Sequence, residues 1–290
     1  MTDQIAPEIE SRLQTLDIYR CYKRSKYLSV KHSSYFHVYE ELLTKYRGKN
    51  FTFVEIGVLN GGSLFMWRDF FGPGARIIGI DLNPDAKKWE KDNFEIFVGS
   101  QSDENFWDQL FLSVGDVDVV LDDGGHTNEQ QIITAEKCFP HIKDGGMLIV
   151  EDTHTSYMTK FGNPSKYSFI NYCKTFIDSI NSRSPSVMVS NNSLNEVVCS
   201  VEVFESIVCF RVDRTKCFAS SLTSNEGISS NARDFRNQGS LLQESEDFLR
   251  RRLRFLSVDG IVRRSGAYVA RLMFSVRAKL RSRKLRKYFR

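Results

Sequence analysis

The side chains best suited to chemistry are three acids and one histidine that follow directly after two short apolar runs. They are Asp123, His126, Glu151 and Asp152. The runs, 116–121 and 145–150, have the composition of buried parallel strands. Ligands of open α/β sheets bind outside the carboxyl ends of the strands. Three carboxylates and an imidazole at that edge indicate a hard divalent cation beside a general base. The alternative is that the acids are solvated turn residues or helix caps, and for Asp122 taken alone we favour it.

A glycine-rich turn after an earlier apolar strand indicates a second part of the same site. Residues 54–63 follow the pattern E-x-G-x-x-x-G-G, which departs from the G-x-G-x-x-G of dinucleotide-binding folds. Glycines allow the backbone to approach a ligand, and the following helix begins with free N–H groups. Asp81 ends the next strand, 24 residues after Gly57, where an acid suits two ribose hydroxyls. Residues 99–103, after the third strand, could face an adenine ring.

The elements that must position these residues alternate between strand and helix. Strands are predicted at 51–57, 76–81, 94–98, 116–121 and 146–151, and helices near 62–71, 103–112, 127–140 and 164–182. This alternation indicates right-handed crossovers and a parallel sheet. Two further β-like runs, 197–204 and 206–212, are close enough to form a hairpin. We therefore expect an α/β fold, a doubly wound and mainly parallel sheet with an antiparallel hairpin at one edge.

Length and composition set the domain organisation. With 290 residues and 41% hydrophobic content, the chain has room for one large α/β domain and an appendage. We divide it into an N-terminal helical segment (1–49), a central domain (50–213), a linker rich in Ser, Asn and Gln (214–247) and a basic helical tail (248–290). No run of about 18 apolar residues predicts a membrane-spanning helix. The lack of a signal-peptide pattern and six cysteines without C-x-x-C spacing favour a cytoplasmic location with reduced thiols.

Positive charge is concentrated in the tail. Residues 248–290 hold 15 Lys/Arg and one acid, a balance of +14, whereas residues 1–247 hold 25 Lys/Arg and 35 acids, a balance of −10. An apolar stripe at helical spacing runs through the tail and consists of Val269, Leu272, Met273, Val276 and Leu280. Three interpretations stay open: attachment to an anionic surface at the inner face of a membrane, packing on the body or in a homo-oligomer, and, weighted lowest, nucleic-acid binding.

Residues from about 30 to 212 resemble the class I S-adenosylmethionine-dependent methyltransferases. More narrowly, they are similar to metal-dependent sugar O-methyltransferases of the macrocin and mycinamicin type, with cephalosporin-hydroxylase-like proteins as relatives. The similarity rests on 54–63, 80–81, 99–103, 122–126 and 151–153. It implies a Rossmann-like methyltransferase fold in which His126 is the base. It implies that magnesium, or another divalent cation, is held by Asp123, Glu151 and Asp152. It implies that S-adenosylmethionine is bound by Glu55, Gly57, Asn60, Gly61, Ser63, Asp81, Gln101 and Asp122.

The activity expected from this resemblance is methyl transfer from S-adenosylmethionine to a sugar hydroxyl. The acceptor would be a glycan, a glycolipid or a glycosylated metabolite, as in polysaccharide biosynthesis. Because a sugar hydroxyl holds its proton tightly, a cation would stabilise the developing alkoxide while the imidazole of His126 accepts the proton. Two alternatives stay open. One is a catechol-type O-methyltransferase, which also pairs magnesium with acids, and the other is a catalytically inactive cofactor-binding scaffold in a glycan-assembly complex.

Overall fold

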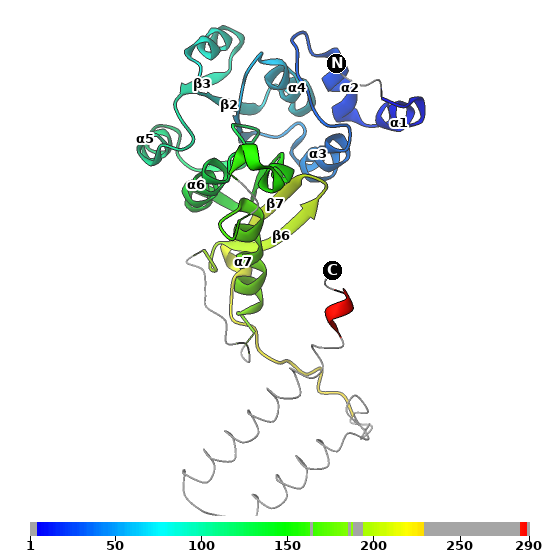
Figure 1. Cartoon of the computed structure of the whole chain (residues 1–290), viewed down its shortest axis with the longest axis vertical. Helices are drawn as coiled ribbons and strands as arrows, with labels where there is room; N and C mark the ends of the chain where they lie inside the picture. The colour runs from blue at the N-terminus through cyan, green and yellow to red at the C-terminus, as the bar shows by residue number, and fades with distance from the viewer. Residues whose placement is uncertain (1–4, 163–164, 185–186, 188–193, 229–284, 289–290) are drawn as a thin grey trace, which may run out of the picture. The chain divides into compact units, whose positions relative to one another are not determined.

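The computed structural model describes residues 5–162, 165–184, 187, 194–228 and 285–288. The chain forms two compact units, 1–222 and 223–290, and the first contains every residue predicted for the site (Figure 1). The linker predicted for 214–247 is described only as far as residue 228. The tail predicted for 248–290 lies outside the described residues, except for 285–288, which include the short 3₁₀ helix η7 (Arg286–Tyr288). Among the described residues, no helix combines the length and the apolar character needed to cross a membrane.

A seven-stranded sheet forms the centre of the first unit as far as it is described, with the order β3-β2-β1-β4-β5-β7-β6. Its strands are β1 (Phe51–Ile56), β2 (Ala75–Asp81), β3 (Glu95–Val98), β4 (Val117–Asp122), β5 (Ile142–Val150), β6 (Val198–Phe204) and β7 (Ile207–Val212). The first five strands pair in parallel, whereas β7 pairs antiparallel with β5 and with β6. The strand order reverses between β1 and β4, which is the switch point where such sheets bind ligands. The predicted doubly wound sheet with an antiparallel edge hairpin is confirmed.

Helices flank the sheet at nearly the predicted positions. They are α1 (Pro7–Leu13), α2 (Asp17–Arg24), α3 (Tyr35–Leu43), α4 (Gly62–Phe71), α5 (Glu104–Val114), α6 (Asn128–Cys138) and α7 (Phe169–Asn181). Side chains of Asp103, Thr127 and Ser168 cap α5, α6 and α7 by accepting backbone N–H groups. The cap at Ser168 explains why α7 begins at Phe169 and not at 164. A 3₁₀ helix, η2 (Pro84–Asp92), was not predicted.

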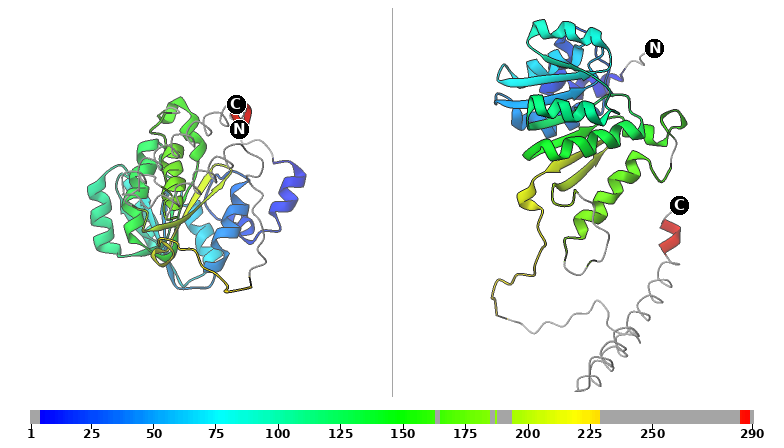
Figure 2. Two further views of the ribbon diagram at one scale, coloured as in Figure 1. Left: turned by 90° about the horizontal axis from the view of Figure 1, so that it is seen from below. Right: turned by 90° about the vertical axis from the view of Figure 1, so that its left-hand side faces the viewer.

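Alternate residues of the strands face two separate cores. Phe53 of β1 belongs to the core shared with α2, α3 and α4, whereas Val54 belongs to the core shared with α5, α6 and α7. Strand β1 is buried along its whole length, as expected for a strand covered on both faces. Figure 2 shows the blue N-terminal helices and the green helices on opposite sides of the sheet. The predicted site residues therefore lie at the edge of a sheet whose two faces are both covered by packed helices.

The connection between α2 and α3, residues 25–34, packs against the start of α4. We call it the 25–34 loop. The carbonyl oxygens of Tyr27 and Leu28 lie so close to Gly62 that a Cβ on that glycine would be 2.3 and 2.5 Å from them. The ring of Tyr27 also packs on Trp89, with centroids 4.4 Å apart. These contacts hold the loop beside the carboxyl ends of the strands, where Val30 lines a cavity.

Candidate active site

The predicted acids gather at the carboxyl ends of β4 and β5. Asp123 follows β4, while Glu151 and Asp152 follow β5. Backbone hydrogen bonds join neighbouring strand ends, because the N–H of Asp123 donates to the carbonyl of Ile56 at 3.0 Å. Two residues here have left-handed backbone conformations, with φ of 58° at His126 and 55° at Asp152. Such values are uncommon outside glycine, and both residues line the cavity.

The cavity has a volume of about 420 Å³ and opens at the switch point of the sheet. Half of the predicted site residues line it, namely Gly57, Asp81, Gln101, Asp123, His126 and Asp152. The other half are not among its lining residues: Glu55, Asn60, Gly61, Ser63, Asp122 and Glu151. The predicted set therefore divides into six residues that line a ligand-sized space and six that do not.

The turn after β1 is fixed against the ends of β2 and β4. Gly57 has φ of 92°, and a Cβ on it would lie 2.1 Å from the carbonyl oxygen of Asp123, so only glycine fits there. The Oδ2 atom of Asp81 accepts the N–H groups of Val58 and Leu59 at 2.9 and 2.8 Å. Asp81 therefore shapes the turn and also lines the cavity.

Glu55 is a buried carboxylate behind this turn. Its Oε2 accepts the hydroxyl of Ser63 at 2.9 Å and its Oε1 accepts the indole N–H of Trp67 at 3.0 Å. Burial raises the pKa of Glu55 to about 7. Of the neighbouring predicted residues, Asn60 is exposed, and Gly61 is buried with φ of 79° at the N-cap of α4. In this structure Glu55 and Ser63 support the turn from behind.

Gln101 holds the segment 122–126 in place. Its Nε2 donates to Asp122 at 3.0 Å, and its Oε1 accepts the N–H of Gly125 at 2.8 Å. A Cβ on Gly124 would lie 2.0 Å from that Oε1, which requires glycine at this position unless Gln101 moves. Asp122 is buried, and burial raises its pKa to about 6. Gln101 therefore lines the cavity, while Asp122 lies behind Gln101 and holds its amide in place.

Asp123, His126 and Asp152 come together at the cavity wall. One ligand atom of each lies within 4.8 Å of the other two, and His126 Nε2 is 3.4 Å from Asp152 Oδ2. Thr155 Oγ1 donates to the carbonyl of His126 at 2.8 Å, which fixes the left-handed turn. The buried Nδ1 of His126 has no hydrogen-bond partner among the described residues. The ring nitrogen that faces Asp152 is Nε2, and an imidazole beside a carboxylate can accept a proton from a bound hydroxyl.

Glu151 is engaged by two residues of the N-terminal segment. Its Oε1 accepts the hydroxyl of Tyr39 at 2.5 Å, and its Oε2 lies 2.9 Å from Lys31 Nζ. The same ammonium lies 2.6 Å from Asp123 Oδ2, and the Lys31 side chain is only 2% exposed. Burial disfavours the charged form of Lys31, but the attraction of Asp123, Glu151 and Glu55 outweighs it and raises the pKa of the lysine. Burial raises the pKa of Glu151 against the opposing effect of Lys31.

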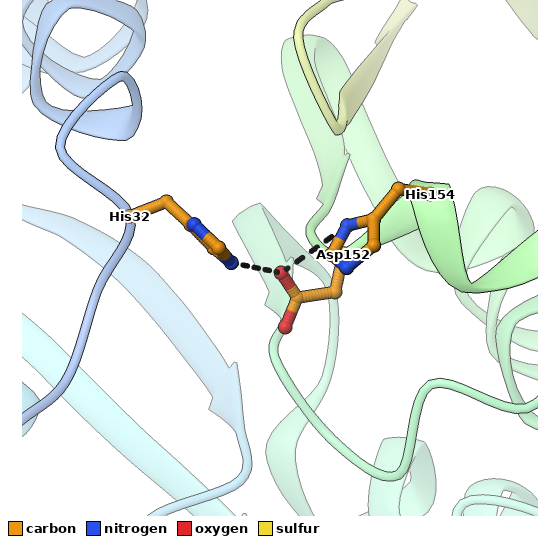
Figure 3. A group of neighbouring side chains, drawn as sticks. All are labelled: His32, Asp152 and His154. Atoms are coloured by element: carbon orange, nitrogen blue, oxygen red, sulfur yellow. Dashed lines mark ion pairs between the residues drawn. The ribbon is translucent and has the colours of Figure 1, made fainter. Parts of the chain in front are cut away.

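A second group surrounds the other oxygen of Asp152. His32 Nε2 and His154 Nδ1 each lie 3.9 Å from Asp152 Oδ1 (Figure 3). Tyr35 donates its hydroxyl to the same oxygen. His154 Nδ1 also contacts Ser206 Oγ. The two carboxylate oxygens of Asp152 thus face different partners, with His126 on one side and this group on the other.

Five residues that contact these acids were not among those predicted for the site. They are Lys31, His32, Tyr35, Tyr39 and His154. The sequence contained a signal for Tyr35 and Tyr39, because their spacing of four residues places both side chains on one face of α3. Nothing in the sequence around Lys31 or His32 links them to acids about 100 residues later.

The donor set suits a hard divalent cation. Magnesium prefers carboxylate oxygens and usually retains several waters. Asp123 and Asp152 line the cavity, and Glu151 precedes Asp152 in the sequence and shares the ammonium of Lys31 with Asp123. The buried ammonium of Lys31 between Asp123 and Glu151 is itself a cation stabilised by this pair. The residues therefore fit the metal implied by the resemblance, and Asp123, Glu151 and Asp152 would hold it.

Comparisons with known proteins support the observed fold and the resemblance to methyltransferases. Residues 54–153 match a family described as a methyltransferase domain. Demethylmacrocin O-methyltransferase of Streptomyces fradiae is 34% identical over 151 residues, which cover 49% of this chain and 38% of that protein. Mycinamicin VI 2''-O-methyltransferase of Micromonospora griseorubida is 32% identical over 154 residues, with the same shares of the two chains. The matched part of the chain thus spans less than half the length of these relatives.

Solved structures of one methyltransferase superpose on most of the chain. MycE, from the mycinamycin biosynthetic pathway, in complex with Mg, SAH and mycinamycin VI, gives a TM-score of 0.62 at 25% identity and covers 79% of this chain and 58% of that one. A second crystal form with Mg and SAH also gives 0.62 at 25% identity, covering 80% of this chain and 59% of that one. Residues 54–153 therefore match a methyltransferase domain, and the chain has a Rossmann-like methyltransferase fold similar to that of MycE.

Proposed function

We propose that the chain is an S-adenosylmethionine-dependent O-methyltransferase that acts on a sugar hydroxyl with the help of a divalent cation. The observation that carries this proposal is one cavity lined both by Gly57 and Asp81, at the ends of β1 and β2, and by Asp123, His126 and Asp152. The first set suits a nucleoside cofactor, and the second suits activation of a hydroxyl. The relatives named as O-methyltransferases, and MycE with Mg and SAH, support the same assignment.

The cofactor half of the cavity lies at the ends of β1 and β2. Gly57 lets the backbone approach a ligand, and Asp81 presents a carboxylate that can accept two ribose hydroxyls. Gln101, fixed by Asp122 and Gly125, is in position to contact the adenine side. Because these groups are already held by internal hydrogen bonds, they form a rigid seat for S-adenosylmethionine.

The chemical half lies at the ends of β4 and β5. His126 is the proposed base, since its ring lies 3.4 Å from Asp152 and its turn is fixed by Thr155. A carboxylate beside the imidazole stabilises the imidazolium formed when the ring takes the hydroxyl proton. A bound divalent cation supplies electrostatic stabilisation of the alkoxide. The protein then mainly positions the acceptor oxygen in line with the methyl group.

The acceptor we propose is a glycan, a glycolipid or a glycosylated metabolite. Two further relatives are named as O-methyltransferases of rhamnosyl tetracenomycin-C compounds, which supports a sugar hydroxyl without selecting among these three classes. The basic segment 248–290 lies outside the described residues apart from 285–288. From its sequence alone we propose that it attaches the protein to an anionic membrane surface, where a lipid-linked acceptor would be found. Packing on the body or in a homo-oligomer, and nucleic-acid binding, are the alternatives for the same segment.

The test is methyl transfer by the full chain with S-adenosylmethionine and magnesium. The acceptors are mycinamicin VI, a pool of lipid-linked glycans and a simple catechol, and mass spectrometry detects the methylated product. His126→Ala should lower turnover roughly 10²- to 10⁴-fold, because a general base is lost. His37→Ala is the matched control, since His37 is exposed on α3 and should leave turnover unchanged. Methylation of the catechol alone, or full turnover in excess EDTA, would contradict the proposal.

A further inference from the structure

We propose that Lys31 is a built-in cation that competes with the divalent metal for Asp123 and Glu151. Metal loading then requires the lysine to withdraw, and this inference rests on the metal-assisted function proposed above. The lysine sets the metal affinity of the site. It also links metal binding to the 25–34 loop, which forms part of the cavity wall.

The geometry supports competition for the same position. Lys31 Nζ lies 2.6 Å from Asp123 Oδ2 and 2.9 Å from Glu151 Oε2. Magnesium binds carboxylate oxygens at about 2.0–2.1 Å. An ion that bridges those two oxygens from the side of the ammonium would lie within about an ångström of it, and two cations cannot occupy that space. The other oxygen of Glu151 already accepts the hydroxyl of Tyr39 at 2.5 Å.

Burial explains why these two acids need a positive charge between them. The side chains of Glu151 and Lys31 are 0% and 2% exposed. Two carboxylates this close would repel each other in a medium of low dielectric constant without a positive charge between them. Either the ammonium or a metal ion can supply that charge. The site is thus stable in both states, and the two cations are alternatives.

The position of Lys31 in the chain connects this exchange with the cavity. Val30, directly before it, lines the cavity, and His32, directly after it, lies 3.9 Å from Asp152 (Figure 3). If the backbone moves when the lysine withdraws, Val30 and His32 move with it; only a swing of the side chain alone would leave them in place. Metal loading is therefore expected to reshape the wall that the cofactor and the acceptor share.

The first measurement is calorimetric titration of the full chain with Mn²⁺, a spectroscopically useful substitute for magnesium. Lys31→Met keeps an unbranched apolar stem of similar length but removes the charge. It should bind Mn²⁺ at least tenfold more tightly than the unmodified protein. Lys26→Met is the matched control, because Lys26 is exposed on the same loop and contacts the ring of Tyr27, and it should leave the affinity unchanged.

The second measurement uses the unmodified protein and so does not depend on the folding of a variant. An amine-reactive ester labels exposed lysines, and mass spectrometry of peptides reports the labelling of Lys31. Labelling should be slow without metal and several-fold faster with saturating Mn²⁺, whereas labelling of Lys26 should not change. The lysine proposal is wrong if Lys31→Met and the unmodified protein bind Mn²⁺ with equal affinity. It is also wrong if Lys31 stays protected from labelling when Mn²⁺ is bound. Either result leaves the proposed function intact. No Mn²⁺ binding by either protein overturns metal assistance, and the lysine proposal with it.

Discussion

Replacing Glu55 by Gln should stabilise the fold at alkaline pH, and the benefit should disappear at acid pH. Glu55 is 0% exposed behind the β1 turn, with its two oxygens accepting from Ser63 and Trp67. Burial raises its pKa from an ordinary value of 4.5 to about 7. The folded protein therefore holds this proton more tightly than the unfolded chain does. Above neutral pH the folded state must contain a buried charge, and that costs free energy.

The magnitude follows from the size of the shift. Between pH 4.5 and about 7 the folded state binds more protons than the unfolded state, so the free energy of unfolding falls as the pH rises. At about 1.4 kcal/mol per pKa unit, this loss reaches about 3 kcal/mol well above pH 7. Gln cannot ionise, and its carbonyl can still accept the indole N–H of Trp67. Its amide must donate to Ser63, whose own proton then loses its acceptor at a cost of about 1 kcal/mol at every pH.

Urea unfolding at pH 5 and pH 8.5, followed by circular dichroism, measures the effect. The free energy of unfolding of Glu55→Gln, minus that of the unmodified protein, should rise by about 2.5 kcal/mol between pH 5 and pH 8.5. Titrating groups that do not interact with Glu55 behave alike in both proteins and cancel. Glu41→Gln, an exposed glutamate on α3, is the control and should show no such change. A difference that is the same at both pH values would refute the reasoning, because burial of the charge would then contribute nothing.

Three further outcomes are expected. Asp81→Asn should weaken binding of S-adenosylmethionine by about 1.5–3 kcal/mol in calorimetry, and unchanged affinity would exclude a ribose contact. Gly57→Ala should lower the free energy of unfolding by more than about 1 kcal/mol and by more than Gly48→Ala does, because Gly48 also has positive φ but no atom within 4 Å of an added Cβ. A chain ending at Glu246 should lose the co-sedimentation with anionic liposomes expected of the full chain, and retention by both in the supernatant at low salt would refute membrane attachment.

The sheet could be predicted from the sequence because its signals are local. The run 116–121 is apolar and short, and it ends in acids, so both its strand character and its position beside 145–150 follow from the rules of parallel sheets. The switch point between β1 and β4 then places Gly57 beside Asp123, as the close contact of 2.1 Å for an added Cβ confirms. The start of α7 was less predictable, since the Ser168 cap competes with several other polar residues as the helix boundary.

The N-terminal side of the site could not be predicted from local signals. Lys31 lies 92 residues before Asp123 and 120 before Glu151, and no periodic pattern connects them. Its surroundings are set by the packing of the 25–34 loop on α4, where Gly62 meets the carbonyl of Leu28. A surface position is the ordinary expectation for a lysine. Its burial depends on two acids that become neighbours only after the sheet has formed.

Glu151 and Asp152 show why a motif does not by itself define a metal site. They are adjacent in sequence, but Glu151 continues the extended path of β5 into the interior, whereas Asp152 turns with φ of 55° toward the cavity. One carboxylate is therefore paired with Lys31 and Tyr39 in the interior, and the other meets His126 at the ligand-accessible surface. Three acids that read as equivalent ligands in the sequence are thus unequal in the fold. In the competition that we propose, Asp152 can meet an incoming ion directly, whereas Asp123 and Glu151 share Lys31 and would exchange it for the metal.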